Sequence, residues 1–506
     1  MAINLLVPLV GPLVLGGLSL LPGANWLRRL SGIFSGVLVL CAGVTLVAAD
    51  RSAQAPVAAS GILRADALSA YMLAVIGAVG IVATWGGLVG RGTDAHSDSD
   101  DSSTSRDPAA KGPRPEGSPP EGMYSALICV FLAAMSLAVI ADNLGVMWVA
   151  VEATTIATAF LVGYHRTRLS LEAAWKYVVL GSVGVAIAFL GIVLLYASSG
   201  GTATPTLSWT ALSQMHADLN PALVRVGAAL AVLGFATKAG LAPMHSWLPD
   251  AHGQAPAPVS ALMSGVLLSV ALYAILRIQS VADRVIGPEF LRTLLVVGGL
   301  LSLAIAAALL IRQRDYKRML AYSSIEHMGV MALGAAVGPA ALSAVLLYML
   351  SHGLVKACLF VLSGRLLALE GTTRIADIRG LLGRRPGIAV PWLIGIIGLI
   401  GFPPFGIFLA QLNIVLAGWA AGMGVIMAIA LALILVIFAA LVRSTVRMMF
   451  GPGEVEGAAA VAPDRAAHGP RLPLALALAA CAVIPFLAGP IGMSLTAAVA
   501  SLGEGR

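Results

Sequence analysis

Apolar residues fall along this chain in long blocks, and not in the short stripes that mark the buried face of a soluble helix. Most blocks reach the roughly 20 residues that a helix needs to cross a bilayer. We count about 14 such spans, which predicts an all-α, polytopic membrane protein. Their approximate cores are residues 4–22, 31–50, 67–90, 123–141, 143–163, 171–197, 222–239 with a continuation to about 264, 265–282, 293–312, 323–338, 340–366, 388–418 with a break, 420–449 and 472–500.

Two of these spans are interrupted by glycine and proline, which end helices. The run Gly240-Leu-Ala-Pro-Met-His-Ser-Trp-Leu-Pro249 interrupts the seventh span, and Gly401-Phe-Pro-Pro-Phe-Gly406 interrupts the twelfth. Two interruptions five spans apart indicate an internal repeat, and the second copy is inverted because five is an odd number. We therefore expect two inverted five-helix repeats with discontinuous helices 7 and 12.

The spans and loops divide the chain into five units. These are helices 1–3 (1–91), a loop (92–122), the first repeat (123–282), the second repeat (283–450), and a loop with the last helix (451–506). Segment 92–122 is rich in Asp and Ser and then in Pro and Gly, so we expect a disordered cytoplasmic loop. Lys and Arg gather in alternate loops, and the loop 198–220 has none. This bias predicts that both termini lie outside, and it explains the net charge of +7 without nucleic acid.

Composition supports a membrane protein without a cofactor of its own. The 506 residues are 59% hydrophobic and 11% charged, whereas soluble domains carry roughly a quarter charged residues. The four cysteines form no paired motif with metal or cluster spacing. The chain also lacks a dinucleotide fingerprint and a phosphate loop. We expect no cofactor and no metal in this subunit.

A lysine beside the first break is the leading candidate for function. Lys238 would place an ammonium at bilayer depth, which costs about 2.5 kcal/mol or more. Glu152, in the fifth span, is its expected partner. Burial disfavours a charged lysine and a nearby carboxylate favours it, so breaking this pair would release a proton. A purely structural salt bridge is the alternative.

The eleventh span carries a second pair. His352 and Lys356 are four residues apart, so they share one face of an otherwise apolar helix. We expect Lys238, Lys356 and His352 to form a polar row at mid-membrane, in which water carries protons from one group to the next. Histidine suits this role because it ionises near neutral pH.

Other ionisable residues are further candidates, each with a structural alternative. Lys176 pairs with an acidic residue four positions earlier, and it could equally snorkel to the interface. Glu326 and His327 open the tenth span, where a helix cap or a partner contact explains them as well as proton transfer. His245 and His252 flank the first break and could only satisfy freed backbone groups.

Two long motifs resemble a known family. They are Lys238-Ala-Gly-Leu-Ala-Pro-Met-His-Ser-Trp-Leu-Pro-Asp-Ala-His-Gly-Gln-Ala-Pro-Ala-Pro-Val-Ser260 and Asp315-Tyr-Lys-Arg-Met-Leu-Ala-Tyr-Ser-Ser-Ile-Glu-His-Met-Gly329. Both are similar to signatures of the antiporter-like, proton-translocating membrane subunits of respiratory complex I and group 4 membrane-bound hydrogenases. The Ser-Ile-Glu-His-Met-Gly and Gly-Phe-Pro-Pro-Phe-Gly runs most resemble hydrogenase-4 component F.

The resemblance implies a 14-helix fold and proton translocation coupled to redox chemistry in partner subunits. Glu152 matches the family's fifth-helix glutamate and Lys238 its seventh-helix lysine, while His352 and Lys356 match an eleventh-helix pair of some members. Two positions depart from the pattern. Ser269 replaces an eighth-helix lysine, and Gln411 replaces a twelfth-helix Glu or Lys. The sequence therefore does not establish how protons would leave by the outward exit of a standard channel.

Three functions agree with these residues. The leading one is a proton-translocating, non-redox subunit of an oxidoreductase complex of the hydrogenase-4, formate hydrogenlyase or complex I type. NiFe or Fe–S centres are then expected only in partner subunits, and the location is a bacterial or archaeal cytoplasmic membrane. The alternatives are a cation/proton antiporter subunit of the multi-subunit type and a scaffold subunit with a degenerate channel.

Overall fold

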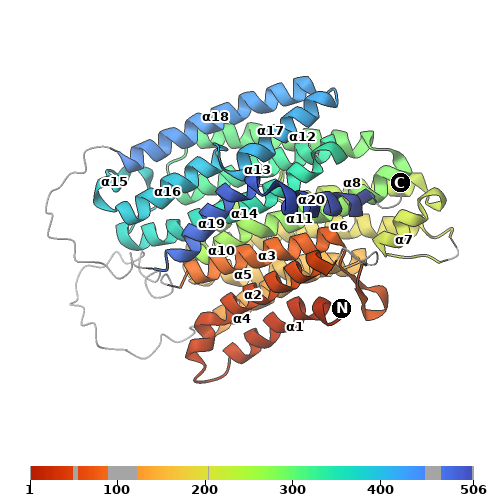
Figure 1. Cartoon of the computed structure of the whole chain (residues 1–506), viewed down its shortest axis with the longest axis horizontal. Coiled ribbons are helices and arrows are strands. Elements are labelled where there is room, and N and C mark those ends of the chain that lie inside the picture. The colour runs from red at the N-terminus through yellow and green to blue at the C-terminus, as the bar shows by residue number, and fades with distance from the viewer. Residues whose placement is uncertain (1, 50–54, 89–121, 203, 451–468, 504–506) are drawn as a thin grey trace.

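The computed structural model describes residues 2–49, 55–88, 122–202, 204–450 and 469–503. Within them the chain is almost entirely helical, with one small hairpin of β1 (Val57–Ala58) and β2 (Leu63–Arg64). The helices lie side by side in one elongated bundle, and α1 begins at the same end at which α20 finishes (Figure 1). We call this the terminal end. The predicted loop 92–122 lies, except for Gly122, outside the described residues.

Ten helices of the described part are long and apolar enough to cross a membrane. They are α2 (Asn25–Ala49), α3 (Ala67–Gly86), α4 (Met123–Ile140), α5 (Leu144–Val162), α6 (Arg168–Ser198), α8 (Pro221–Lys238), the continuous helix of α10 (Ala257–Leu262), the π-helical turn η3 (Met263–Leu267) and α11 (Leu268–Ile286), then α12 (Glu289–Ile311), α14 (Pro339–Glu370) and α18 (Gly424–Met449).

Shorter or more polar helices complete the bundle. They are α1 (Ala2–Ser19), α7 (Trp209–Gln214), α9 (Trp247–Gln254), α13 (Tyr316–Val337), α15 (Leu381–Arg384), α16 (Pro386–Leu399), α17 (Gly406–Ala420), α19 (Leu472–Val483) and α20 (Ala488–Gly503). If α16 with α17, and α19 with α20, each make one span, these helices are consistent with the expected number of spans. The division into five units stays a prediction.

Both predicted helix breaks are present, and their backbones match. Helix α8 ends at Lys238, and the second residue after it, Gly240, has a φ of 73°. Helix α16 ends at Leu399, and the second residue after it, Gly401, has a φ of 72°. Glycine adopts this left-handed conformation without the strain that a side chain brings. Lys238 and Leu399 therefore occupy equivalent positions in the two breaks.

The eighth span begins earlier than the sequence indicated. After the first break the chain forms only α9, which ends at Gln254, and a new helix starts at Ala257 instead of residue 265. Two prolines explain the difference. Pro256 interrupts the helix because it has no N–H to donate, and Pro258 fits the first turn of the next helix, where that donor is not needed.

The tenth span also begins earlier than expected. Helix α13 starts at Tyr316 because Asp315 caps it, its carboxylate accepting a hydrogen bond from the Arg318 N–H at 2.9 Å. Glu326 and His327 consequently lie in the middle of the helix and are buried. The expectation that they open the span was wrong, and with it the reading as a helix cap.

A close contact between two glycines places α14 against the eighth span. Gly265 lies in the π-helical turn, and Gly353 lies beside His352 on α14. A Cβ on Gly353 would stand 2.6 Å from the Gly265 carbonyl oxygen, so only glycine allows this approach. Small residues at such contacts let membrane helices pack backbone to backbone. This contact holds the His352 and Lys356 pair at the centre of the bundle.

Candidate functional site

Lys238 is fully buried and held by two hydroxyl groups. Its Nζ donates hydrogen bonds to the Thr155 Oγ1 at 2.8 Å and to the Tyr177 hydroxyl at 2.5 Å. It also lies 4.7 Å from the centre of the Tyr177 ring, at the edge that carries the hydroxyl group. The Trp247 indole supports the break by donating to the Thr237 carbonyl at 2.9 Å.

Glu152 reaches Lys238 through a threonine and not directly. One Glu152 carboxylate oxygen accepts from the Thr155 hydroxyl at 3.2 Å, and the other accepts from the Ser182 hydroxyl at 2.9 Å. The two charged side chains, both in the described chain, form no direct ion pair, which corrects the expected contact. Because a hydroxyl both donates and accepts, Thr155 forms a continuous hydrogen-bonded link from the ammonium to the carboxylate.

Lys356 forms a second buried centre in α14. Its Nζ donates to the Leu320 carbonyl and to the Ser323 hydroxyl, both at 2.5 Å and both on α13. Glu326 is buried one turn further along α13, and one of its carboxylate oxygens has no hydrogen-bond partner among the described residues. A lysine and an acidic side chain are thus buried together at the α13–α14 contact.

Two histidines and a tyrosine extend this centre. The His327 Nδ1 is 2.7 Å from the Tyr348 hydroxyl, and the ring centroids of His327 and His352 are 5.0 Å apart. The Tyr348 hydroxyl also accepts a hydrogen bond from the Gln411 side chain at 2.9 Å. Gln411 thus touches the row through Tyr348, whereas the hydroxyl of Ser269 is buried without a partner in the described chain.

Lys176 and His245 lie apart from the buried groups. The exposed Lys176 pairs with Glu172 at 2.8 Å and with Asp250 at 3.3 Å. His245 is half-buried, and its Nδ1 donates to the Pro243 carbonyl at 3.1 Å. Surface ion pairs contribute little to stability. The histidine contact agrees with the alternative that His245 satisfies a backbone group at the break.

His252 lies at the centre of the bundle, where its place beside the first break did not predict it. It is fully buried, its ring stacks on Phe360 with 4.9 Å between centroids, and the Lys356 Nζ is 5.9 Å from that same phenyl ring. Neither ring nitrogen has a hydrogen-bond partner within the described residues, so capping of the break does not explain this side chain.

The centre of the bundle holds several polar atoms that the described chain leaves without a hydrogen-bond partner. These atoms belong to His252, Ser269, Glu326, His327, Ser351 and His352. Buried polar atoms are nearly always hydrogen-bonded, to water where protein groups are lacking. This row therefore calls for water between groups that can gain or lose a proton. Among the described residues, no three His, Cys, Asp or Glu side chains are grouped as a metal site.

Comparisons with known proteins identify the family of this chain. Residues 141–437 match the family model described as "NADH:quinone oxidoreductase/Mrp antiporter, TM". The chain is 38% identical over 341 residues to a "Hydrogenase-4 component F homolog" of Methylacidiphilum infernorum, covering 66% of this chain and 71% of that protein. It is 34% identical over 315 residues to the NADH-quinone oxidoreductase subunit N of Chloroflexus aggregans, covering 60% of this chain and 63% of the relative, just under two thirds of its length.

Solved structures give the same result for the fold. A chain of the membrane-bound sulfane sulfur reductase, an archaeal respiratory membrane complex, superposes with a TM-score of 0.81 at 25% identity, covering 100% of this chain and 98% of that one. A chain of the Mrp complex from Dietzia sp. gives 0.82 at 21% identity, covering 99% and 97%. At the latter identity the likeness concerns the fold alone.

Proposed function

The chain belongs to the NADH:quinone oxidoreductase/Mrp antiporter transmembrane family, and from this premise we propose that it moves protons through its buried Lys, Glu and His side chains while partner subunits transfer electrons. It is an antiporter-like membrane subunit of the kind found in complex I and group 4 hydrogenase complexes. The observation that carries the proposal is the hydroxyl-bridged link of Lys238, Thr155 and Glu152 at a helix break.

The bridge provides a simple switch. While Thr155 joins the two charges, the carboxylate stabilises the ammonium of Lys238. If the threonine hydroxyl turns away, the buried lysine loses part of that support, and desolvation favours its neutral form. A small movement of the break after Lys238 is enough to make or lose contacts of 2.8 Å.

The second half of the path uses the groups at the α13–α14 contact. A proton released from Lys238 passes through water to His252, which lies against the Phe360 ring near Lys356. From His252 the proton passes to Lys356, then to His352 and then to His327. The ring centroids of His352 and His327 are 5.0 Å apart. In this scheme Glu326 stabilises the positive charge as it arrives.

The relatives favour a hydrogenase-type complex as the setting. The relative at 38% identity is named a hydrogenase-4 component F homolog. We propose that NiFe or Fe–S centres reside in the partner subunits, and that this chain has none. The location we propose is a bacterial or archaeal cytoplasmic membrane, with both termini outside.

The test compares three variants of the complete complex in membrane vesicles. Lys238→Ala and Glu152→Gln should abolish redox-driven proton uptake, while electron transfer to an artificial dye by the partner subunits continues. Lys176→Ala is the matched control, because that lysine is exposed and paired at the surface. Proton movement in Lys238→Ala equal to that of the control would sink the proposal. A flux that requires sodium would instead support a cation/proton antiporter, and absence of flux in the unmodified complex would support a scaffold.

A further inference from the structure

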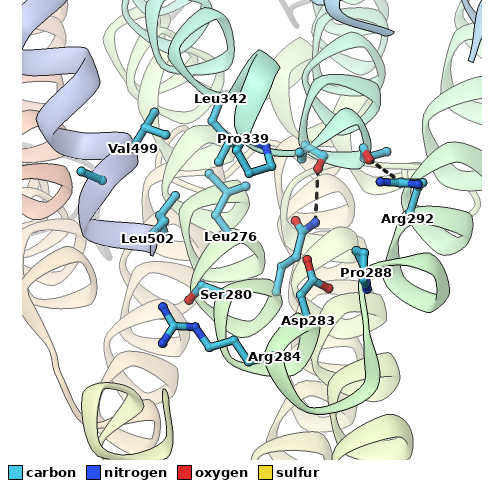
Figure 2. Close-up of a pocket in the computed structure, with 15 residues that line it drawn as sticks. Leu276, Ser280, Asp283, Arg284, Pro288, Arg292, Pro339, Leu342, Val499 and Leu502 are labelled. Atoms are coloured by element: carbon cyan, nitrogen blue, oxygen red, sulfur yellow. Dashed lines mark hydrogen bonds between the residues drawn. The ribbon is translucent and has the colours of Figure 1, made fainter. Parts of the chain in front are cut away.

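A cavity of about 500 Å³ opens at the terminal end of the bundle, away from the buried lysines. Its walls come from α11, the start of α12, the junction between α13 and α14, and the last turn of α20 (Figure 2). On α11 five residues line the cavity, along one side of the helix toward its end: Leu276, Gln279, Ser280, Asp283 and Arg284. The cavity thus extends into the bundle along a mostly polar stripe.

The inner part of this stripe requires water. Gln279 is only 8% exposed, and its Nε2 donates to the Ala335 carbonyl at 3.2 Å, but its Oε1 has no hydrogen-bond partner among the described residues. At about 30 Å³ per molecule, the cavity has room for on the order of fifteen waters. The lining carries charges of both signs, from Asp283, Arg284 and Arg292, and water is the occupant we assign to it.

The cavity lies further along the same two helices as His327 and Tyr348, the last groups of the polar row. On α13, steps of four residues lead from His327 through Met331 to Ala335, which lines the cavity. On α14, steps of three residues lead from Tyr348 through Val345 to Leu342, which also lines it. These stretches rise about 12 Å and about 9 Å along the helix axes.

Met331 on α13 and Val345 on α14 lie between the row and the cavity along these steps. Met331 and Val345 are both fully buried. Methionine is unbranched and flexible, so it can move aside for a transient file of water more easily than a β-branched residue. The two buried side chains therefore stand between the row and the cavity on these helices, and movement of Met331 is the change that would admit water between them.

We propose that this cavity is the aqueous outlet of the proton row, with Met331 and Val345 as its gate. The inference rests on the proposed function, and it gives protons an exit that does not need an ionisable residue at the position of Gln411. A glutamine cannot release a proton at neutral pH, and Gln411 is engaged with Tyr348. Protons from the His327 and Tyr348 pair leave instead toward Gln279 and Ser280, and so reach the terminal end of the bundle.

The experiment places a cysteine in the cavity of the otherwise intact complex. Ser280→Cys is treated with a negatively charged, membrane-impermeant methanethiosulfonate reagent applied from the terminal side. Thr204→Cys is the control, because Thr204 is exposed in the loop after α6 at the same end. We expect both cysteines to react, and only the modified Ser280→Cys complex to lose proton flux, by roughly tenfold, which corresponds to about 1.4 kcal/mol of added barrier.

Other results would contradict the outlet or the proposed function. Modification of Ser280→Cys without loss of flux, or equal loss in Thr204→Cys, overturns the outlet. Reaction only from the opposite side overturns it too, because the cavity would then face the loading side. If neither the untreated Ser280→Cys complex nor the unmodified complex shows proton flux, the proposed function is wrong. That result is distinct from a failure of the outlet proposal, which requires flux before treatment.

Discussion

Thr155 is the residue whose replacement tests the link between the two charges most directly. Thr155→Val keeps the shape of the side chain but removes the hydroxyl that accepts from Lys238 and donates to Glu152. Tyr177 still holds the ammonium and Ser182 still holds the carboxylate, so neither charge loses all its partners. The change therefore removes the connection and leaves the fold in place.

The magnitude follows from the lost hydrogen bond. A hydrogen bond to a charged group contributes about 1.5–3 kcal/mol. If proton exchange between Lys238 and Glu152 passes through Thr155, the barrier rises by that amount, and the rate falls roughly 10- to 150-fold. Thr155→Ser, which retains the hydroxyl, should recover most of the flux.

The assay is redox-driven acidification of membrane vesicles containing the complete complex, followed with a pH-sensitive dye. Thr154→Val is the matched control, because Thr154 is buried on the same helix and its hydroxyl donates only to the Val151 carbonyl, at 2.6 Å. Equal flux in the Thr155→Val and Thr154→Val complexes would refute the reasoning, since it would show that protons do not need the bridge.

Three further changes probe other parts of the molecule. Arg277→Met leaves Asp66 buried without its partner at 2.6 Å, so the complex should lose about 3–5 kcal/mol of stability in thermal unfolding, and the added change Asp66→Asn should restore part of it. Gly353→Ala should cost about 1–3 kcal/mol, because its Cβ would meet a carbonyl oxygen at 2.6 Å, whereas Gly383→Ala meets nothing within 4 Å and should be neutral. His252→Phe fills the same space but carries no proton, so flux should fall roughly a hundredfold with unchanged protein yield; unaltered flux would remove His252 from the path.

The sequence was sufficient for the features that depend on local chain chemistry. Gly240 and Gly401 mark the two helix breaks because the left-handed conformation favours glycine, and both breaks are present. Lys238 and Lys356 stand out in any apolar run, and both are buried. Their roles in proton transfer stay predictions.

The sequence could not predict features that depend on how the helices are rotated against one another. Nothing in the pattern around Glu152 says that Thr155 stands between it and Lys238, because that depends on the rotation of α5 against α6 and α8. Glu326 was misplaced because the basic residues before it suggested a loop, while Asp315 starts the helix earlier. His252 was passed over because a histidine near a helix break usually has a backbone partner.

The equivalence of Lys238 and Leu399 has a consequence for direction. Two inverted halves with the same charge at both breaks would present the same face to each side of the membrane, and neither side would be preferred for loading. Here one break ends in an ammonium and the other in an isobutyl group, on the same backbone. The two halves are therefore unequal at the very position where the helix breaks, and only a path with unequal halves can favour one direction of proton movement.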